Sequence, residues 1–145
     1  MNEELASSLQ SKLDGKTKPP GSLGDLEPLA LRVGMILGTL EPQLKSPTML
    51  IFAGDHGITK EGVSPYPSEV TAQMVKNFLS GGAAINVFCR QHGFDLKVID
   101  AGVASDFEKH PLLVDEKIAH GTANFLKEKA MSENRAKECI SRGEK

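Results

Sequence analysis

The spacing of hydrophobic positions changes along the chain, and the changes predict alternating strands and helices. Residues 48–53 (TMLIFA) form a continuous apolar run, which is typical of a parallel strand covered on both faces. Helical spacing follows at 68–79 and 83–92, and a second strand-like run occupies 96–101 (LKVIDA). A strand, crossover helices and another strand form a βαβ unit. The chain is therefore predicted to be an α/β protein with a Rossmann-like parallel sheet.

Two amphipathic helices are predicted before the first strand. Residues 3–13 carry leucines at a spacing of four, and residues 26–37 place apolar side chains on one face, with Ser22 as the expected cap. Glycines and prolines separate these helices from each other and from the strand. We expect residues 1–40 to be the N-terminal helical segment of a small second domain and residues 41–145 to be the first part of the α/β domain.

The C-terminal third has a weaker pattern. Residues 114–119 are compatible with a short edge strand, and residues 121–124 with a turn. A helix in an alternating α/β pattern normally leads to another strand, whereas the last predicted helix runs to Lys145. The sheet is therefore expected to be incomplete and the α/β domain truncated. Ser132 is predicted to cap this last helix, with its inward-facing residues being Ala136, Cys139 and Ile140.

Composition and charge narrow the class of partner. The 145 residues carry a net charge of -2, which gives no basic footprint for nucleic acid. No apolar run approaches the roughly 18 residues of a membrane span, and the polar N-terminus does not resemble a signal peptide. Cys89 and Cys139 are far apart and are expected to be reduced, buried thiols. We expect a cytoplasmic protein with neither a nucleic acid nor a membrane as its partner.

The turn after the first strand is the best candidate for chemistry. Asp55 and His56 stand between glycines, at the edge where parallel α/β sheets bind ligands, and Asp100 is expected at the same edge. A carboxylate beside an imidazole can orient or exchange a proton, although such a pair can also serve only to satisfy loop amides. Gly57 would let a ligand approach the backbone. The other histidines occur in unrelated contexts: His92, His110 and His120. No metal site and no cofactor are predicted.

Two further groups of residues are compatible with ligand binding. Gly81 and Gly82 precede a predicted helix and either present free N–H groups to an anion or form a hinge between helices. Tyr66, Gln73 and Met74 would suit a flat aromatic ligand if they surround an apolar cleft. The alternative is that Tyr66 lies on the surface and Met74 lies in the core.

Several motifs in order along the chain resemble one enzyme family. They are KPPGSLG at 18–24, FAGDHG at 52–57, EGVSPYPSEVTAQMV at 61–75, NFLSGGAAINV at 77–87 and VIDAGV at 98–103. Together they resemble the N-terminal part of the CobT family, the nicotinate-nucleotide–dimethylbenzimidazole phosphoribosyltransferases. The resemblance covers most of the chain, and ordered motifs at family-like spacing are more specific than any one of them alone.

The resemblance implies a reaction of cobalamin lower-ligand synthesis. The phosphoribosyl group of nicotinate mononucleotide passes to 5,6-dimethylbenzimidazole, without a metal, in a homodimeric enzyme. It implies that residues 62–67, Gln73 and Met74 line the benzimidazole pocket, and that Asp55 and His56 lie at the floor of the crevice. The general-base glutamate of the family is expected beyond Lys145. No catalytic residue is therefore predicted here, and the 145 residues alone are expected to bind weakly without turnover.

Two other functions remain open on the sequence. The chain could be a non-catalytic module that binds a benzimidazole-like base or docks on a partner protein. A metal-dependent hydrolase built on Asp55 and His56 is a third hypothesis, which would require bound metal in the purified protein.

Overall fold

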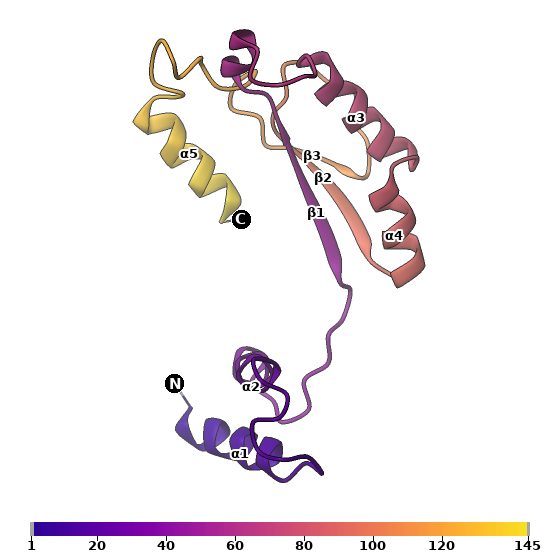
Figure 1. Ribbon diagram of the computed structural model, residues 1–145, viewed down its shortest axis with the longest axis vertical. Helices are drawn as coiled ribbons and strands as arrows, with labels where there is room; N and C mark the ends of the chain where they lie inside the picture. Colours follow the sequence, from indigo (N-terminus) through magenta and orange to yellow (C-terminus); the bar gives the residue numbers. More distant parts are fainter. Residues whose placement is uncertain (1, 145) are drawn as a thin grey trace. The chain divides into compact units, whose positions relative to one another are not determined.

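The computed structural model describes residues 2–144 and divides into two compact units, Met1–Lys45 and Ser46–Lys145 (Figure 1). The first unit contains helices α1 (Glu3–Asp14) and α2 (Leu26–Leu37). The second contains β1 (Thr48–Gly54), the 3-10 helix η1 (Gly57–Glu61), α3 (Glu69–Ser80), α4 (Ala84–His92), β2 (Asp95–Gly102), β3 (Leu113–Asp115) and α5 (Glu133–Gly143).

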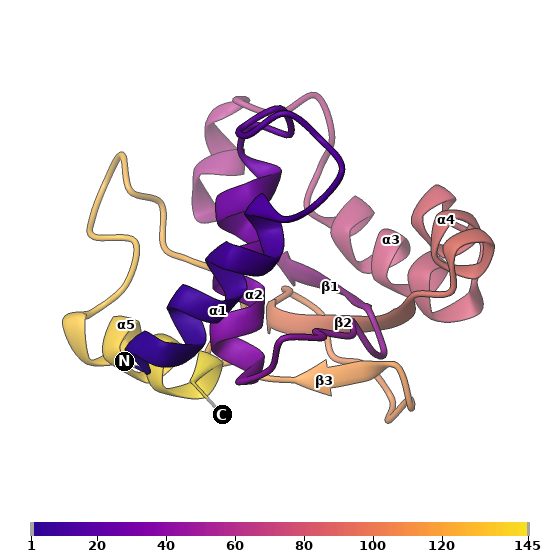
Figure 2. The same cartoon turned by 90° about the horizontal axis from the view of Figure 1, so that it is seen from below.

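The three strands form one parallel sheet in the order β1-β2-β3, and the strands run side by side in Figure 2. This confirms the predicted α/β class with a parallel sheet. The third strand is shorter than the predicted range of 114–119. It ends at Asp115, whose side chain accepts a hydrogen bond from the N–H of Lys117 (3.2 Å) in a local turn.

One face of the sheet forms the hydrophobic core of the second unit. Val98 of β2 and Val103 just beyond it are fully buried, and Val75 of α3 packs on them with no exposed surface. Ala53 of β1 completes this cluster. Every second residue of a strand points to the same face, and the side chains on this face pack against α3.

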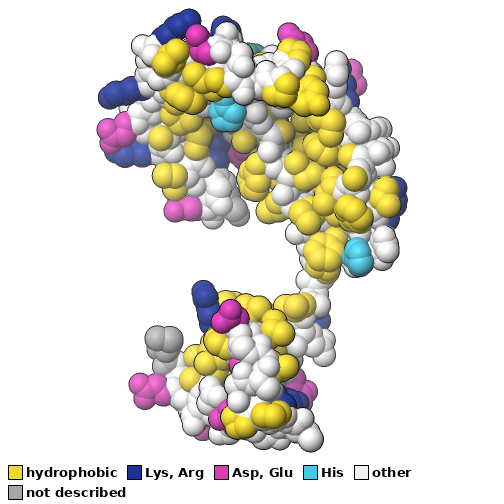
Figure 3. Space-filling view, viewed as in Figure 1, with side chains coloured by type: hydrophobic (Ala, Val, Ile, Leu, Met, Phe, Trp, Pro, Cys, Tyr) yellow, Lys and Arg dark blue, Asp and Glu magenta, His cyan; other side chains and the backbone are white. Residues whose placement is uncertain are grey.

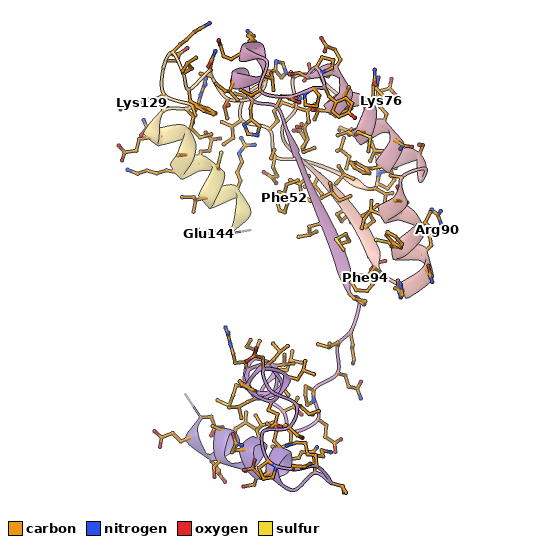
Figure 4. The ribbon with its side chains drawn as sticks, in the orientation of Figure 1. Phe52, Lys76, Arg90, Phe94, Lys129 and Glu144 are labelled. Carbon is orange, nitrogen blue, oxygen red and sulfur yellow. The ribbon has the colours of Figure 1, made fainter. Side chains whose placement is uncertain are left out.

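The opposite face of the sheet stays open among the described residues. Leu50 and Phe52 of β1 are 52% and 66% exposed, and Phe52 points away from α3 and α4 (Figure 4). The prediction that this strand is covered on both faces is therefore wrong for this structure. Helix α5 lies on the open side but leaves a gap of about 470 Å³ between itself and the sheet. Hydrophobic side chains, coloured yellow, gather on the second unit in Figure 3.

The predicted inward face of the last helix is also wrong. Ile140 is 64% exposed, Cys139 is exposed, and only Ala136 is partly covered. Cys89, in contrast, is buried as predicted, and both thiols are free. The helix is held by polar contacts instead, since Arg142 donates a hydrogen bond to the carbonyl of Lys117 (3.2 Å).

The ends of the helices follow the local sequence with one exception. Gly38, Gly81 and Gly93 end α2, α3 and α4 in the left-handed conformation that glycine adopts without strain. Ser132 caps α5 as predicted. Ser22 does not cap α2, because residues 19–26 fold into successive reverse turns and the helix begins only after Asp25.

The loop before α2 is closed by one glutamate. Glu27 accepts a hydrogen bond from the N–H of Leu23 (3.1 Å) and pairs with Lys18 at 2.9 Å. The hydrogen bond from Lys18, followed by that from Leu23, holds the pKa of Glu27 below its ordinary value of 4.5. A single carboxylate thus fastens the KPPGSLG loop to the first turn of its own helix.

The chain beyond β1 is paired with a distant segment. The N–H of Asp55 donates to the carbonyl of Gly102, and the carbonyl of Asp55 accepts from Thr122, both at 3.0 Å. Gly57 then donates to the carbonyl of Thr122 (3.0 Å). A Cβ on Gly57 would lie 2.6 Å from the backbone nitrogen of Asn124, so this pairing requires glycine.

We expect Gly57→Ala to lower the free energy of unfolding by about 2–3 kcal/mol, because the added methyl group meets backbone that cannot move aside. Gly54→Ala in the same turn is the matched control, since its Cβ would make only ordinary contacts of 3.9–4.0 Å with Gly102. The control should change stability by no more than roughly 0.5 kcal/mol. Urea unfolding of both variants measures the difference, and equal losses would contradict the packing argument.

Glu27→Gln should remove a pH-dependent part of the stability of the first unit. Since the pKa of Glu27 is lower in the folded state, its contribution is present above pH 4.5 and disappears as the pH falls through the folded pKa. The variant should therefore be less stable than the parent protein near neutral pH, and the gap should close below pH 4.5. Unfolding midpoints between neutral and acidic pH measure this. Glu41→Gln, at an 84% exposed side chain 3.6 Å from Lys12, should show no such gap.

Candidate functional site

The carboxyl ends of β1 and β2 lie next to each other and are fastened by Asp55. Its side chain is buried, and Oδ2 accepts a hydrogen bond from the N–H of Ala104 (2.8 Å). With the two main-chain bonds described above, this residue joins three segments of the chain. The hypothesis that the carboxylate satisfies loop amides is therefore confirmed for one of its oxygens.

His56 is exposed beside this carboxylate. Its carbonyl accepts hydrogen bonds from the N–H and the hydroxyl of Thr59, which begins the 3-10 helix η1. Its ring nitrogen Nδ1 lies 3.4 Å from the hydroxyl of Thr122. The backbone thus fixes the position of His56, while its ring faces solvent.

Two clefts flank the Asp55–His56 turn. The first, called the polar cleft, has a volume of about 450 Å³ and lies between this turn, the start of α3 and the segment after β3. Its polar side chains include those of Asp55, His56, Lys60, Glu69, His120 and Thr122. The second, called the apolar cleft, measures about 270 Å³ and shares the turn. It is lined on its other sides by Phe52, Ala101, Ile118, Met131, Arg135 and Cys139.

The structure brings only some of the predicted site residues together. Asp55, His56 and Gly57 line the polar cleft. Tyr66 is 67% exposed, and Met74 is 40% exposed on α3, so neither lies in the core. Gln73 is exposed as well, four residues after Glu69 of the polar cleft. These three side chains are outside the polar cleft but belong to the segment that forms its rim.

Gly81 and Gly82 lie at the other end of α3, about 18 Å along the helix from the polar cleft. Their N–H groups donate to the carbonyls of Phe78 and Asn77. The N–H of Ala83 donates to the side chain of Asn86 (3.1 Å). These glycines form the hinge between α3 and α4, and their N–H groups already have partners within the chain.

Asp100 lies at the same edge as Asp55, as predicted, and is 2% exposed. Its Oδ1 accepts hydrogen bonds from the N–H groups of Gly102 (3.1 Å) and Val103 (2.9 Å). Its Oδ2 lies 3.1 Å from the ammonium group of Lys117. A buried carboxylate and a nearly buried lysine therefore hold the loop after β2.

Lys117 gathers three oxygen atoms around its ammonium group. It donates to the carbonyl of Ser105 (2.6 Å) and to Oδ1 of Asp106 (3.1 Å), in addition to pairing with Asp100. Burial by itself would lower the pKa of Lys117, but the hydrogen bonds to Asp106 and Asp100 outweigh it and raise the pKa above 10.5. The lysine is therefore charged at neutral pH, and its contacts hold these three residues together.

His120 and its neighbours were missed by the sequence analysis, which placed His120 in an unrelated context. In the structure its Nε2 lies 3.0 Å from Oδ1 of Asp106, and the residue lines the polar cleft with His56. The adjacent Gly121 is required there, since a Cβ would lie 2.7 Å from the carbonyl oxygen of Asp55. One feature of the sequence could have located His120. A glycine follows it after a third parallel strand, and that strand ends at the edge that also carries Asp55.

The described residues contain neither a cluster of metal ligands nor a helix that could span a membrane. Within residues 2–144, no three histidine, cysteine or acidic side chains come close enough together to hold a metal ion. No helix in the same range is long and apolar enough to cross a membrane.

Comparison with known sequences identifies relatives along nearly the whole chain. A family model described as phosphoribosyltransferase (DBI_PRT) matches residues 1–145. The nicotinate-nucleotide–dimethylbenzimidazole phosphoribosyltransferase of Dechloromonas aromatica is 55% identical over 139 residues, which is 96% of this chain and 40% of that protein. The enzyme of the same name from Cupriavidus necator is 53% identical over 99% of this chain and 41% of its own length.

Solved structures agree with the sequence relatives. The crystal structure of CobT from Thermus thermophilus matches with a TM-score of 0.85 and 42% identity, over 93% of this chain and 40% of that chain. A second structure from the same organism, titled as the dimethylbenzimidazole phosphoribosyltransferase, gives a TM-score of 0.86 over 95% of this chain and 42% of its own. This chain thus spans about 40% of the length of its relatives. Since the family model covers residues 1–145 and the solved CobT structure has the same fold at 42% identity, the chain belongs to the CobT family of phosphoribosyltransferases.

Proposed function

We propose that this chain forms the N-terminal part of a nicotinate-nucleotide–dimethylbenzimidazole phosphoribosyltransferase. The observation that carries the proposal is the 55% identity to the Dechloromonas aromatica enzyme across 96% of the chain. The reaction serves cobalamin lower-ligand synthesis in the cytoplasm, with nicotinate mononucleotide and a benzimidazole base as substrates. In the whole enzyme two copies form a homodimer, and residues 1–40 contribute to a small helical domain.

The part of the reaction assigned to this chain is substrate binding. Gln73 lies one helical turn from Glu69 on the same face of α3, so it adjoins the polar cleft. Tyr66 and Met74 offer exposed aromatic and thioether surface in the same segment, which suits the flat ring of a benzimidazole. We assign these three residues to the base and the Asp55–His56 turn to the floor of the crevice.

The chemistry defines what the remainder of the enzyme has to supply. One ring nitrogen of the base attacks the ribose carbon, the bond from this carbon to nicotinate breaks, and nicotinate leaves with the bonding pair. The N–H proton on the other ring nitrogen passes to a general base, the glutamate that the family resemblance places beyond Lys145. The 145 residues therefore position substrates without turning them over.

One feature favours a second candidate function, a non-catalytic docking module. The open face of the sheet exposes Leu50 and Phe52, and α5 exposes Ile140. An apolar surface of this kind is typical of a face that contacts another protein segment. A docking module would bind such a segment without any gain in phosphoribosyl transfer.

A chimaera tests the enzymatic proposal. We expect the 145 residues alone to form no α-ribazole phosphate from nicotinate mononucleotide and dimethylbenzimidazole. Fused to the part of the Dechloromonas aromatica enzyme that follows its matched 139 residues, the chain should turn over at least about 100-fold faster than either piece, because general-base catalysis is restored. Product is measured by liquid chromatography with mass detection. A folded chimaera that forms no product would support the docking module.

Substitution on α3 tests the assignment of the base site. Gln73→Ala should weaken binding of dimethylbenzimidazole roughly 2- to 10-fold, the range expected for one lost hydrogen bond. Lys76→Ala is the matched control, since Lys76 is also exposed on α3 (Figure 4). Chemical-shift titration measures both affinities, including weak ones. Equal effects of the two substitutions would remove Gln73 from the base site.

A further inference from the structure

His120 is a histidine of the polar cleft whose ring nitrogen Nε2 contacts a carboxylate, and this contact determines which ring nitrogen carries the hydrogen. The hydrogen bonds from His120 and then from Lys117 hold the pKa of Asp106 below its ordinary value of 3.8, so this carboxylate is ionised at neutral pH. An ionised carboxylate only accepts hydrogen bonds. The 3.0 Å contact between its Oδ1 and Nε2 of His120 therefore requires the hydrogen to be on Nε2.

In the neutral form of His120, this contact leaves a free lone pair on Nδ1. In a neutral imidazole one nitrogen donates and the other accepts, so a hydrogen on Nε2 leaves Nδ1 as the acceptor. Among residues 2–144, no hydrogen bond to this atom is formed. In contrast, Nδ1 of His110 accepts from the N–H of Leu112 (3.2 Å), and Nδ1 of His56 lies near the hydroxyl of Thr122.

The partner of His120 is itself held in place from the interior. Asp106 is 83% exposed at its side chain, yet its Oδ1 also accepts from Lys117, whose side chain is 12% exposed. Lys117 in turn pairs with Asp100, whose side chain is 3% exposed. The nearly buried Lys117 thus holds Asp106, and Asp106 in turn orients the ring of His120, whose side chain is 57% exposed.

The surroundings of His120 indicate the class of ligand group. The polar cleft is rich in hydroxyl, carboxylate and imidazole groups, whereas the neighbouring apolar cleft carries Phe52, Ile118 and Met131. A polyhydroxylated group matches the polar cleft better than a flat aromatic ring does. In the proposed reaction this group is the ribose that passes from nicotinate to the base.

We propose that the polar cleft holds the ribose of the mononucleotide and that Nδ1 of His120 accepts a hydrogen bond from one of its hydroxyl groups. Asp106 and Lys117 are positioning residues that fix the tautomer and the ring orientation. The inference rests on the proposed function, since it takes nicotinate mononucleotide as the ligand. It assigns the sugar to residues 55–57 and 120–122, with Gln73 next to the rim of the same cleft.

A ligand-and-residue cycle tests the contact. Nicotinate mononucleotide and its 2′,3′-dideoxy analogue are titrated into the parent chain and into His120→Ala, with affinities measured from chemical shifts. The parent chain should prefer the natural ligand, and this preference should fall roughly 2- to 10-fold in the variant, because one neutral hydrogen bond is removed. His92→Ala, at an exposed histidine at the end of α4, is the matched control and should keep the full preference.

Long-range proton–nitrogen spectra of the imidazoles test the positioning residues. The parent chain should show His120 with hydrogen on Nε2, and Asp106→Asn and Lys117→Met should both increase the population of the other tautomer. His110 serves as the internal reference, because its ring contacts the backbone of its own loop. A purely structural role of Lys117 would lower stability without changing this population.

The outcomes separate the two proposals. An undiminished preference in His120→Ala, or hydrogen on Nδ1 in the parent chain, would overturn the inference and leave the proposed function intact. A parent chain with no affinity for the mononucleotide would overturn the ribose assignment, and a folded chimaera that forms no product would overturn the proposed function. A reduced preference in His120→Ala, with the control unchanged, would support the ribose contact.

Discussion

The structure depends on the interlocking of three segments at Asp55. Its N–H, carbonyl and carboxylate each bond to a different partner, on Gly102, Thr122 and Ala104. Parallel strands are joined only through crossovers, so their carboxyl ends need contacts of their own to form a defined crevice. A buried residue with three satisfied polar groups provides this contact. The glycines at 57 and 121 follow from it, because both permit backbone approaches closer than a side chain allows.

The parts of the fold that local sequence determines were predicted well. The strands at 48–53 and 96–101 and the helix ends at Gly38, Gly81 and Gly93 depend on apolar runs and on glycine conformation, and the structure confirms them. What failed depended on tertiary context. A continuous apolar run predicts a strand but does not determine which of its faces other elements cover. In this structure β1 is covered on one face only. The burial of Cys139 failed for the same reason.

Only part of the candidate site could be predicted from the sequence. Asp55 and His56 follow a strong strand, so the rule for parallel sheets located them. His120 follows the weak three-residue strand β3, and its partner Asp106 is in a loop with no periodic pattern. The contact between His120 and Asp106 depends on Lys117, whose ammonium group contacts both Asp106 and Asp100. Contacts between loops are set by side-chain geometry, and spacing along the chain does not encode them.

The two clefts share one turn, so a single crevice offers two environments of unlike polarity. Atoms of Asp55 and His56 line both clefts, with polar side chains on one side and Phe52, Ile118 and Met131 on the other. In the proposed reaction the ribose would occupy the polar cleft, and the base would lie at the rim of this cleft against Tyr66, Gln73 and Met74. A buried carboxylate that is bonded to a backbone amide separates these environments without adding a mobile charge between them. Positioning of this kind is what the proposed phosphoribosyl transfer requires of residues that do not themselves move the proton.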